Sequence, residues 1–153
     1  MQALFTCLIC VQFLVVVLHD QLDIPGWHHG SRVRTVVGPA KFWIGTVVNA
    51  IFPGIAVWYA IYWWGRTPSV KAANYWVIYC AITVASAAAM WWIPYFRGGS
   101  EKQNREYGAM YAGTKHVLPA RGDNPRPNLL HLYFHVLFAA TLGLAVVMRL
   151  HVG

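Results

Sequence analysis

The chain has 153 residues, of which 58% are hydrophobic and 11% are charged, whereas about a quarter of the residues of a soluble protein are charged. This composition excludes an ordinary soluble domain and indicates a single-domain integral membrane protein with the lipid bilayer as its main partner. The net charge of +7 does not indicate nucleic-acid binding, because the basic residues flank apolar stretches and form no stripe with exposed aromatic residues.

Four apolar stretches are long enough to cross a membrane. They cover about residues 3–19, 42–64, 72–96 and 128–149. About 20 apolar residues span the hydrocarbon of a bilayer as a helix, and in lipid each helix must satisfy its own backbone polar groups. The sequence therefore predicts an all-α, polytopic membrane protein, a four-helix bundle over residues 1–153. No basic segment precedes the first stretch and no cleavage site follows it, so we expect a retained helix and not a signal peptide.

Basic residues predict the orientation. Nine of the twelve Lys and Arg residues lie in the first and third loops, residues 20–41 and 97–127. By the positive-inside rule these loops are cytoplasmic and both termini lie outside the cytoplasm. All five acidic residues and six of the seven histidines belong to the same side, so we expect any chemistry there. The chain is also tryptophan-rich, and tryptophans near the span ends are expected to anchor it at the interfaces.

The third loop contains the pattern of a short helix. Ser100 and Gln103 have the spacing of a capping box, in which each side chain satisfies a backbone donor of the other residue. Tyr107 and Tyr111 follow on one face at helical spacing. We expect an amphipathic helix on the bilayer surface or against the mouth of the bundle. The alternative is a docking surface for a partner protein.

Two features within the spans concern packing. Pro53 removes the hydrogen bond that the carbonyl of Asn49 would accept, which predicts a kink in the second helix. A ligand pocket could form at this kink from Asn49, Pro53 and Tyr59, with Tyr107 and Tyr111 from the third loop, or neighbouring helices could absorb the kink without any function.

The third helix carries small residues at every fourth position. Ala81, Ala85 and Ala89 form a stripe that lets another helix backbone come close. This stripe predicts that the third helix is the packing centre of the bundle.

The stretch RGDNPRPNLLHLYFH, residues 121–135, leads into the fourth span. Its prolines prevent helix formation until after Pro127, and Asn128 is then the expected N-cap. His131 and His135 consequently lie one turn apart on the same face of the helix, near the cytoplasmic mouth.

A metal ion requires three or four ligands, so this histidine pair needs partners. His19 and Asp20, at the same side of the membrane, are the candidates. With His131 and His135 they would hold a metal ion or haem b. Two alternatives remain open: the polar residues pair among themselves and tie the loops to the helix ends, or they form a substrate site without a metal. The leading expectation is that no cofactor is bound.

Other ligand types are disfavoured. The three cysteines, Cys7, Cys10 and Cys80, lie within apolar stretches, which argues against a disulfide framework or a zinc knuckle. His28 and His29 stand between two glycines and are predicted to be solvated loop.

The segments WWIPYF and SEKQNREYGAMYAGTKHVLPARGDNPRPNLLHLYFH cover most of residues 91–135. They resemble a widespread group of small bacterial four-helix membrane proteins. In the first half, LHDQLDIPG matches the same group loosely. The resemblance implies a protein of the bacterial inner membrane, but it implies neither an activity nor a catalytic residue.

Two functions follow as hypotheses. The first is a non-catalytic interaction or accessory subunit of a membrane complex, with another membrane protein or a second copy of the chain as partner. It is based on the amphipathic third loop, the alanine stripe and the incomplete ligand set. The second is a metal- or haem-binding enzyme or redox protein that acts on a lipid or a quinone at the cytoplasmic interface.

Overall fold

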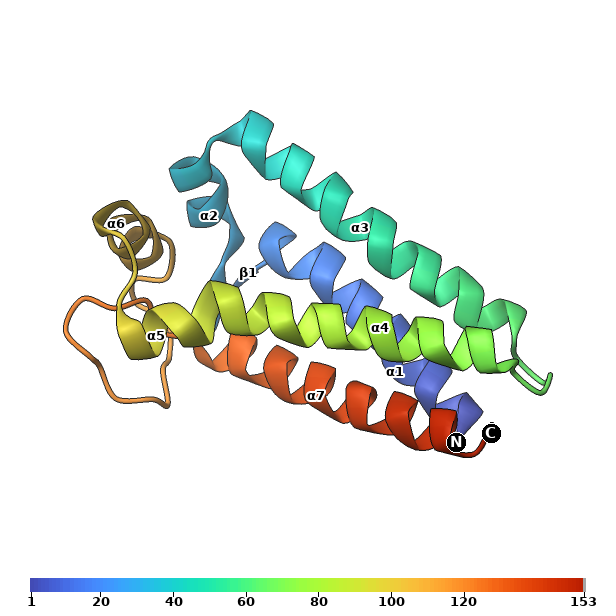
Figure 1. Cartoon of the computed structure of the whole chain (residues 1–153). Helices are drawn as coiled ribbons and strands as arrows, with labels where there is room; N and C mark the ends of the chain where they lie inside the picture. Colours follow the sequence, from blue (N-terminus) through green and yellow to red (C-terminus); the bar gives the residue numbers. More distant parts are fainter. Residues whose placement is uncertain (153) are drawn as a thin grey trace.

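A computed structural model describes residues 1–152, and Figure 1 shows four long helices running side by side. All four are long and apolar enough to span a membrane. They are α1 (Gln2–Leu18), α3 (Pro39–Tyr62), α4 (Val70–Ala87), which continues through the π-helical turn η2 (Ala88–Trp92) into α5 (Ile93–Arg97), and α7 (Leu129–Leu150). The predicted all-α, four-helix membrane fold is confirmed.

The packing order of the helices was not evident from the sequence. Helix α7 packs against both α4 and α1, and α1 packs against α3. Apolar side chains from all four helices meet in one core, in which the Phe5 and Trp76 ring centroids are 5.1 Å apart. The first and fourth spans are therefore neighbours, which brings their polar ends together.

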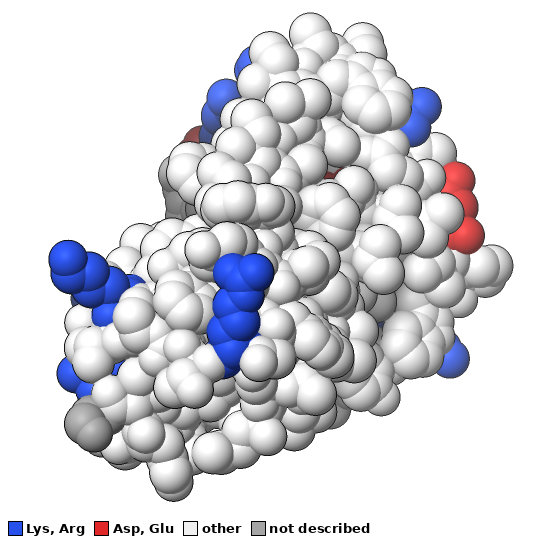
Figure 2. All heavy atoms as spheres, turned by 90° about the vertical axis from the view of Figure 1, so that its right-hand side faces the viewer, with Lys and Arg blue, Asp and Glu red and all other residues white. Residues whose placement is uncertain are grey.

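The outside of the bundle is apolar. Ile44, Phe52 and Trp58 on α3 are 65%, 65% and 64% exposed. Figure 2 views the end at which both termini lie, and it shows separate Lys and Arg side chains on a mostly uncharged surface. Large exposed apolar side chains on helices of this length are expected to face lipid.

The alanine stripe of α4 does not pack within the bundle. Ala81, Ala85 and Ala89 are all exposed, so the prediction that the stripe makes α4 the packing centre is wrong. Small residues that do lie in the core include Ala56 and Ala60 of α3, both 0% exposed, and Ala145 of α7, 1% exposed. α4 buries Trp76 and Cys80 in the core instead.

The end opposite the termini carries the short elements (Figure 1). In chain order they are η1 (His19–Gln21), β1 (Asp23–Ile24), β2 (His28–His29), α2 (Gly30–Val37) and α6 (Glu101–Met110). We call this the loop end of the molecule. Helix α6 is the short helix that was predicted in the third loop.

β1 and β2 form an antiparallel hairpin that was not predicted, although its turn has a clear sequence signal. The Trp27 N–H donates to the Ile24 carbonyl at 2.9 Å, and Gly26 has a φ of 72°. Pro25 followed by Gly26 suits a type II turn, which needs a positive φ at its third residue. This turn reverses the chain after α1 and brings His28 back toward the helix end.

Candidate functional site

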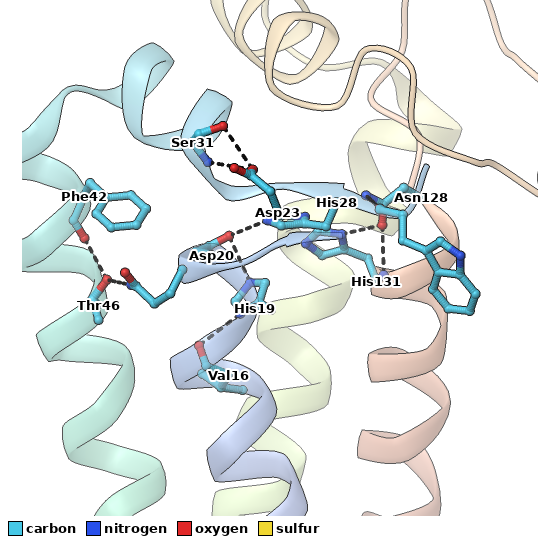
Figure 3. A network of polar contacts seen from close by, with 12 residues as sticks. Val16, His19, Asp20, Asp23, His28, Ser31, Phe42, Thr46, Asn128 and His131 are labelled. Carbon is cyan, nitrogen blue, oxygen red and sulfur yellow. Dashed lines mark hydrogen bonds and ion pairs between the residues drawn. The ribbon is translucent and has the colours of Figure 1, made fainter. Parts of the chain in front are cut away.

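Three imidazoles and one carboxylate meet at the loop end (Figure 3). His19 and Asp20 come from η1, His28 from β2, and His131 from the first turn of α7. The ring centroids of His19 and His28 are 5.7 Å apart, those of His19 and His131 are 5.7 Å apart, and those of His28 and His131 are 5.9 Å apart. We call these four residues the histidine cluster.

Gly30 allows the hairpin to lie directly on the end of α1. A Cβ atom at this position would be 2.9 Å from the Leu22 carbonyl oxygen and closer still to that of Asp20. The Gly30 N–H also donates to the Leu22 carbonyl at 3.1 Å. This close backbone approach holds β2, and with it His28, against Asp20.

Asp23 fixes the start of α2 beside the cluster. Its Oδ1 accepts hydrogen bonds from the backbone N–H and the hydroxyl of Ser31, each at 3.0 Å. These two bonds hold the pKa of Asp23 below its usual range. The carboxylate therefore acts as a side-chain cap for the first turn of α2.

Asn128 orients His131 and ties it to the hairpin. Its side-chain amide donates to the Trp27 carbonyl at 2.9 Å, so its Oδ1 is left as an acceptor. That oxygen accepts the backbone N–H of His131 at 3.0 Å and lies 2.8 Å from His131 Nδ1. Nδ1 must then carry the proton, which leaves Nε2 of a neutral His131 with a free lone pair.

His19 is oriented in the same way by its own helix. Its Nδ1 lies 3.1 Å from the Val15 carbonyl oxygen and 3.0 Å from that of Val16. Carbonyl oxygens only accept, so Nδ1 carries the proton and Nε2 of the neutral ring has a lone pair. This Nε2 lies 3.3 Å from Asp20 Oδ1.

His28 is the most buried member of the cluster. It is 0% exposed, and its Nε2 also lies 3.3 Å from Asp20 Oδ1. This distance suits an ion pair, but among residues 1–152 neither ring nitrogen of His28 nor Asp20 Oδ1 has a partner with hydrogen-bond geometry. An ionised Asp20 and a neutral His19 present only acceptors to each other, and buried acceptors normally have a donor or a cation between them. His28 has no other partner that fixes its tautomer, so its Nε2–H can donate to Asp20, whereas His19 Nε2 adds a lone pair beside the same carboxylate.

Aromatic side chains enclose the cluster. Trp91 lies 4.3 Å from His131, Tyr111 lies 5.1 Å from His131, and Phe134 lies 5.2 Å from His19, measured between ring centroids. These rings keep the imidazoles away from bulk water and in fixed orientations.

The π-helical turn places Trp91 against His131. Pro94 has no N–H to donate to the carbonyl of Met90, and the Tyr107 hydroxyl lies 3.4 Å from that oxygen as a donor. Turns of this kind inside α-helices are frequent at functional sites. Pro94 is a signal in the sequence that could have pointed to this irregularity.

The structure brings together three of the four predicted ligand residues, which are His19, Asp20 and His131. His135 is elsewhere: its ring is 6.4 Å from that of Trp91 and 5.8 Å from that of Trp92. The prediction that His28 is solvated loop is wrong, because His28 is fully buried and is the third imidazole of the cluster. Within residues 1–152, no group of three or more His, Cys, Asp or Glu side chains is arranged so that it could hold a metal ion.

The residues predicted to line a pocket at the kink of α3 separate in the structure. Helix α3 runs through Pro53, which is buried, whereas Asn49 is exposed. Tyr59 packs in the core, with its ring centroid 4.8 Å from that of Tyr75. Tyr107 and Tyr111 line a different cavity at the loop end.

Two cavities flank the histidine cluster. The larger has a volume of about 670 Å³ and lies between α6 and the segment 111–126. The smaller has a volume of about 210 Å³ and is lined by His19 and seven apolar side chains: Leu14, Val15, Leu18, Leu22, Ile24, Leu130 and Phe134. His19 and Tyr111 therefore each connect the cluster with one cavity.

The third loop is fastened to the first loop at the site. The Lys115 N–H donates to the Gly26 carbonyl at 2.7 Å, and the Leu129 N–H donates to the Lys115 carbonyl at 2.8 Å. Ser100 is the N-cap of α6, and its hydroxyl oxygen accepts the Gln103 N–H at 3.2 Å. The loops and helix ends thus form one connected layer.

Comparison of the chain with protein-family models, with curated proteins and with solved structures found no match. The resemblance of residues 91–135 to small bacterial membrane proteins stays a prediction.

Proposed function

We propose that this small integral membrane protein binds a divalent transition-metal ion in the histidine cluster and acts there on a lipid-soluble substrate. The observation that carries this proposal is the convergence of two imidazole nitrogens on one carboxylate oxygen: His19 Nε2 and His28 Nε2 both lie 3.3 Å from Asp20 Oδ1. Imidazole and carboxylate are ligands that zinc, iron and similar ions accept.

Two of the separations are compatible with coordination, and because no group of three or more such side chains within residues 1–152 is arranged to hold an ion, binding requires rotation of side chains in the cluster. Ligand atoms about 2.0–2.2 Å from a tetrahedral ion are about 3.3 Å from one another. His19 Nε2 and His28 Nε2 each have this separation from Asp20 Oδ1, and His131 Nε2 is the fourth candidate ligand. His19 and His131 also use their Nδ1 atoms on oxygen acceptors, which is the usual support for a metal-binding histidine.

A metal ion is favoured over haem b. Trp91, Tyr111 and Phe134 pack directly against the imidazoles, with ring centroids 4.3, 5.1 and 5.2 Å away. A planar macrocycle would need the space that these rings occupy. A bound ion could polarise a substrate oxygen or lower the pKa of a bound water.

The smaller cavity supports a substrate from the lipid phase. Its wall is apolar except for His19, and its lining residues Leu14, Leu18 and Leu22 are 53%, 44% and 47% exposed. A lipid or a quinone could reach the His19 imidazole from the bilayer by this route.

The test is metal content. Protein purified in detergent and dialysed against metal-free buffer is expected to retain about one transition-metal ion per chain. His28→Ala and Asp20→Asn are expected to lower metal affinity at least tenfold, whereas the matched control His151→Ala is expected to leave it unchanged, because His151 lies at the far end of α7.

The proposal is contradicted if the histidine cluster has only a structural role. If the polar residues only tie the loops to the helix ends, the protein will be metal-free, and added Zn²⁺, Co²⁺ or Fe²⁺ will not raise its Tm. His28→Ala would then lower the Tm equally with and without metal.

An accessory or interaction subunit is the second candidate. The observation in its favour is that Ala81 and Ala85 of α4 and Ala89 of η2 are exposed, where another membrane helix could approach closely. The incomplete ligand set also favours it, because no group of three or more His, Cys, Asp or Glu side chains within residues 1–152 is arranged to hold a metal ion. Ala85→Phe is expected to disrupt a homo-oligomer or a complex in cross-linking experiments, whereas Ile51→Phe on the exposed face of α3 is not.

A further inference from the structure

The larger cavity lies beside the histidine cluster but is not part of it. Its volume of about 670 Å³ is within the range of small-molecule sites, which is about 300–1,000 Å³. Tyr111 lines it, and the ring of Tyr111 is 5.1 Å from that of His131. One side chain therefore separates a ligand in this cavity from the cluster.

Arg126 is a cation without an acidic partner in the cavity wall. It is partly buried, and its Nη1 donates to the Leu118 carbonyl at 3.1 Å. None of the ion pairs among residues 1–152 includes Arg126. A guanidinium has five N–H donors, so most of those of Arg126 remain available to a ligand.

The neighbours of Arg126 also favour an acidic ligand. Burial, and after it the charge of Arg126, lowers the pKa of His116, which also lines the cavity. Burial raises the pKa of Tyr111 well above its ordinary value, so its hydroxyl keeps its proton and can donate. Arginine, tyrosine and a nearby imidazole together suit an acidic ligand.

The acidic residues of the cavity wall do not neutralise the charge of Arg126. Glu101 is paired with Arg105 at 3.5 Å, and both side chains are largely exposed. Asp123 is exposed and forms no ion pair within residues 1–152. Among the charged residues of the wall, the partly buried one without a counter-ion is Arg126.

We infer that this cavity binds a phosphate group and that Arg126 is its anchor. The planar guanidinium fork matches phosphate oxygens in a bidentate manner. The cavity also lies at the ends of the spanning helices, where lipid phosphates are found. The headgroup of an anionic lipid and a water-soluble phosphate compound share this chemistry.

The experiment uses the full chain in a maltoside detergent, which contains no phosphate. Binding of inorganic phosphate is measured by calorimetry, and retention of added phosphatidylglycerol is measured by native mass spectrometry. Arg126→Gln is expected to weaken binding at least tenfold. Arg105→Gln is the matched control, because Arg105 lines the same cavity but is paired with Glu101, and it is expected to change binding less than threefold.

A second variant excludes a simple folding defect. Gly108 lines the cavity and a Cβ atom there meets nothing within 4 Å, so Gly108→Leu adds bulk at the cavity wall while Arg126 itself is retained. It is expected to weaken binding as Arg126→Gln does, with little change in Tm.

Retention of phosphatidylglycerol alone supports the lipid source, and binding of inorganic phosphate alone supports the soluble source. Absence of both, or an equal loss in Arg105→Gln and Arg126→Gln, overturns the inference. Metal content is measured on the same samples and is expected to be unchanged in Arg126→Gln, so failure of this inference can be distinguished from failure of the metal proposal.

Discussion

Neighbouring histidines in this chain have different environments. His28 is fully buried, whereas His29 is partly exposed, because successive residues of a strand point to opposite sides. His131 is held by Asn128 in the cluster, while His135 lies one turn deeper against Trp91 and Trp92. The sequence shows the histidines, but only the hairpin geometry decides which of them meet.

Gly30→Ala tests the contact that holds His28 at the end of α1. The new methyl group would overlap the carbonyls of Asp20 and Leu22, so we expect the free energy of unfolding to fall by about 1–3 kcal/mol. Thermal unfolding in detergent measures this. Gly45→Ala is the control, since a Cβ there meets nothing within 4 Å and alanine favours a helix, so it should stabilise the protein slightly. Equal effects of the two substitutions would contradict the close approach at Gly30.

Asn128→Ala removes three interactions at once. The variant loses the N-cap of α7, the donor to the Trp27 carbonyl and the acceptor for His131 Nδ1. A lost cap lowers stability by about 1 kcal/mol, and each of the two buried groups left unsatisfied adds about 1–3 kcal/mol, so we expect a total of about 3–7 kcal/mol. Ser69→Ala, which removes only the cap of α4, should lower stability by about 1 kcal/mol. Similar Tm values for the two variants would argue against the role of Asn128 as the link between the loops.

At the scale of elements, strong local sequence signals were sufficient to predict the long helices and α6. The spans follow from hydropathy, and the first residues of α6 and α7 follow from the N-caps Ser100 and Asn128. The two-residue hairpin strands and the π-helical turn depend on tertiary contacts. The backbone of Gly30 lies close to the Asp20 carbonyl, and the Tyr107 hydroxyl donates a hydrogen bond to the Met90 carbonyl. The outward direction of the alanine stripe on α4 could not be predicted either, because small residues suit contacts both within the chain and with another chain.

The third loop should loosen at mildly acidic pH. His116 Nδ1 donates to the Pro127 carbonyl at 3.1 Å, and burial lowers the pKa of His116 from its usual value near 6.5. The unfolded chain then binds more protons than the folded chain below that value, so the stabilisation is present above about pH 6.5 and is lost as the pH falls.

Hydrogen exchange of residues 114–128, corrected for the intrinsic rate, is expected to be faster at pH 5.5 than at pH 7.5. In His116→Gln this difference should be much smaller, because the titrating group is gone. An unchanged difference in the variant would assign the effect to another group.

At the scale of the whole molecule, the two ends of the bundle differ. The loop end holds the histidine cluster, both cavities and the short elements, whereas the other end holds the termini and the connection between α3 and α4 (Figure 1). All five acidic residues and nine of the twelve basic residues belong to the loop end. This distribution concentrates the charged and titratable side chains at one end of the bundle.

The charge distribution predicts which side that is. Loops rich in Lys and Arg are retained in the cytoplasm, so the loop end should be cytoplasmic and both termini should lie outside. A C-terminal alkaline phosphatase fusion, which folds only outside the cytoplasm, is expected to be active, and a C-terminal green fluorescent protein fusion is expected to be dark. The same reporters inserted in the exposed turn at Gly122 should give the opposite result. A fluorescent C-terminal fusion would place the histidine cluster and the larger cavity outside, so that any ligand of either would have to come from the other compartment.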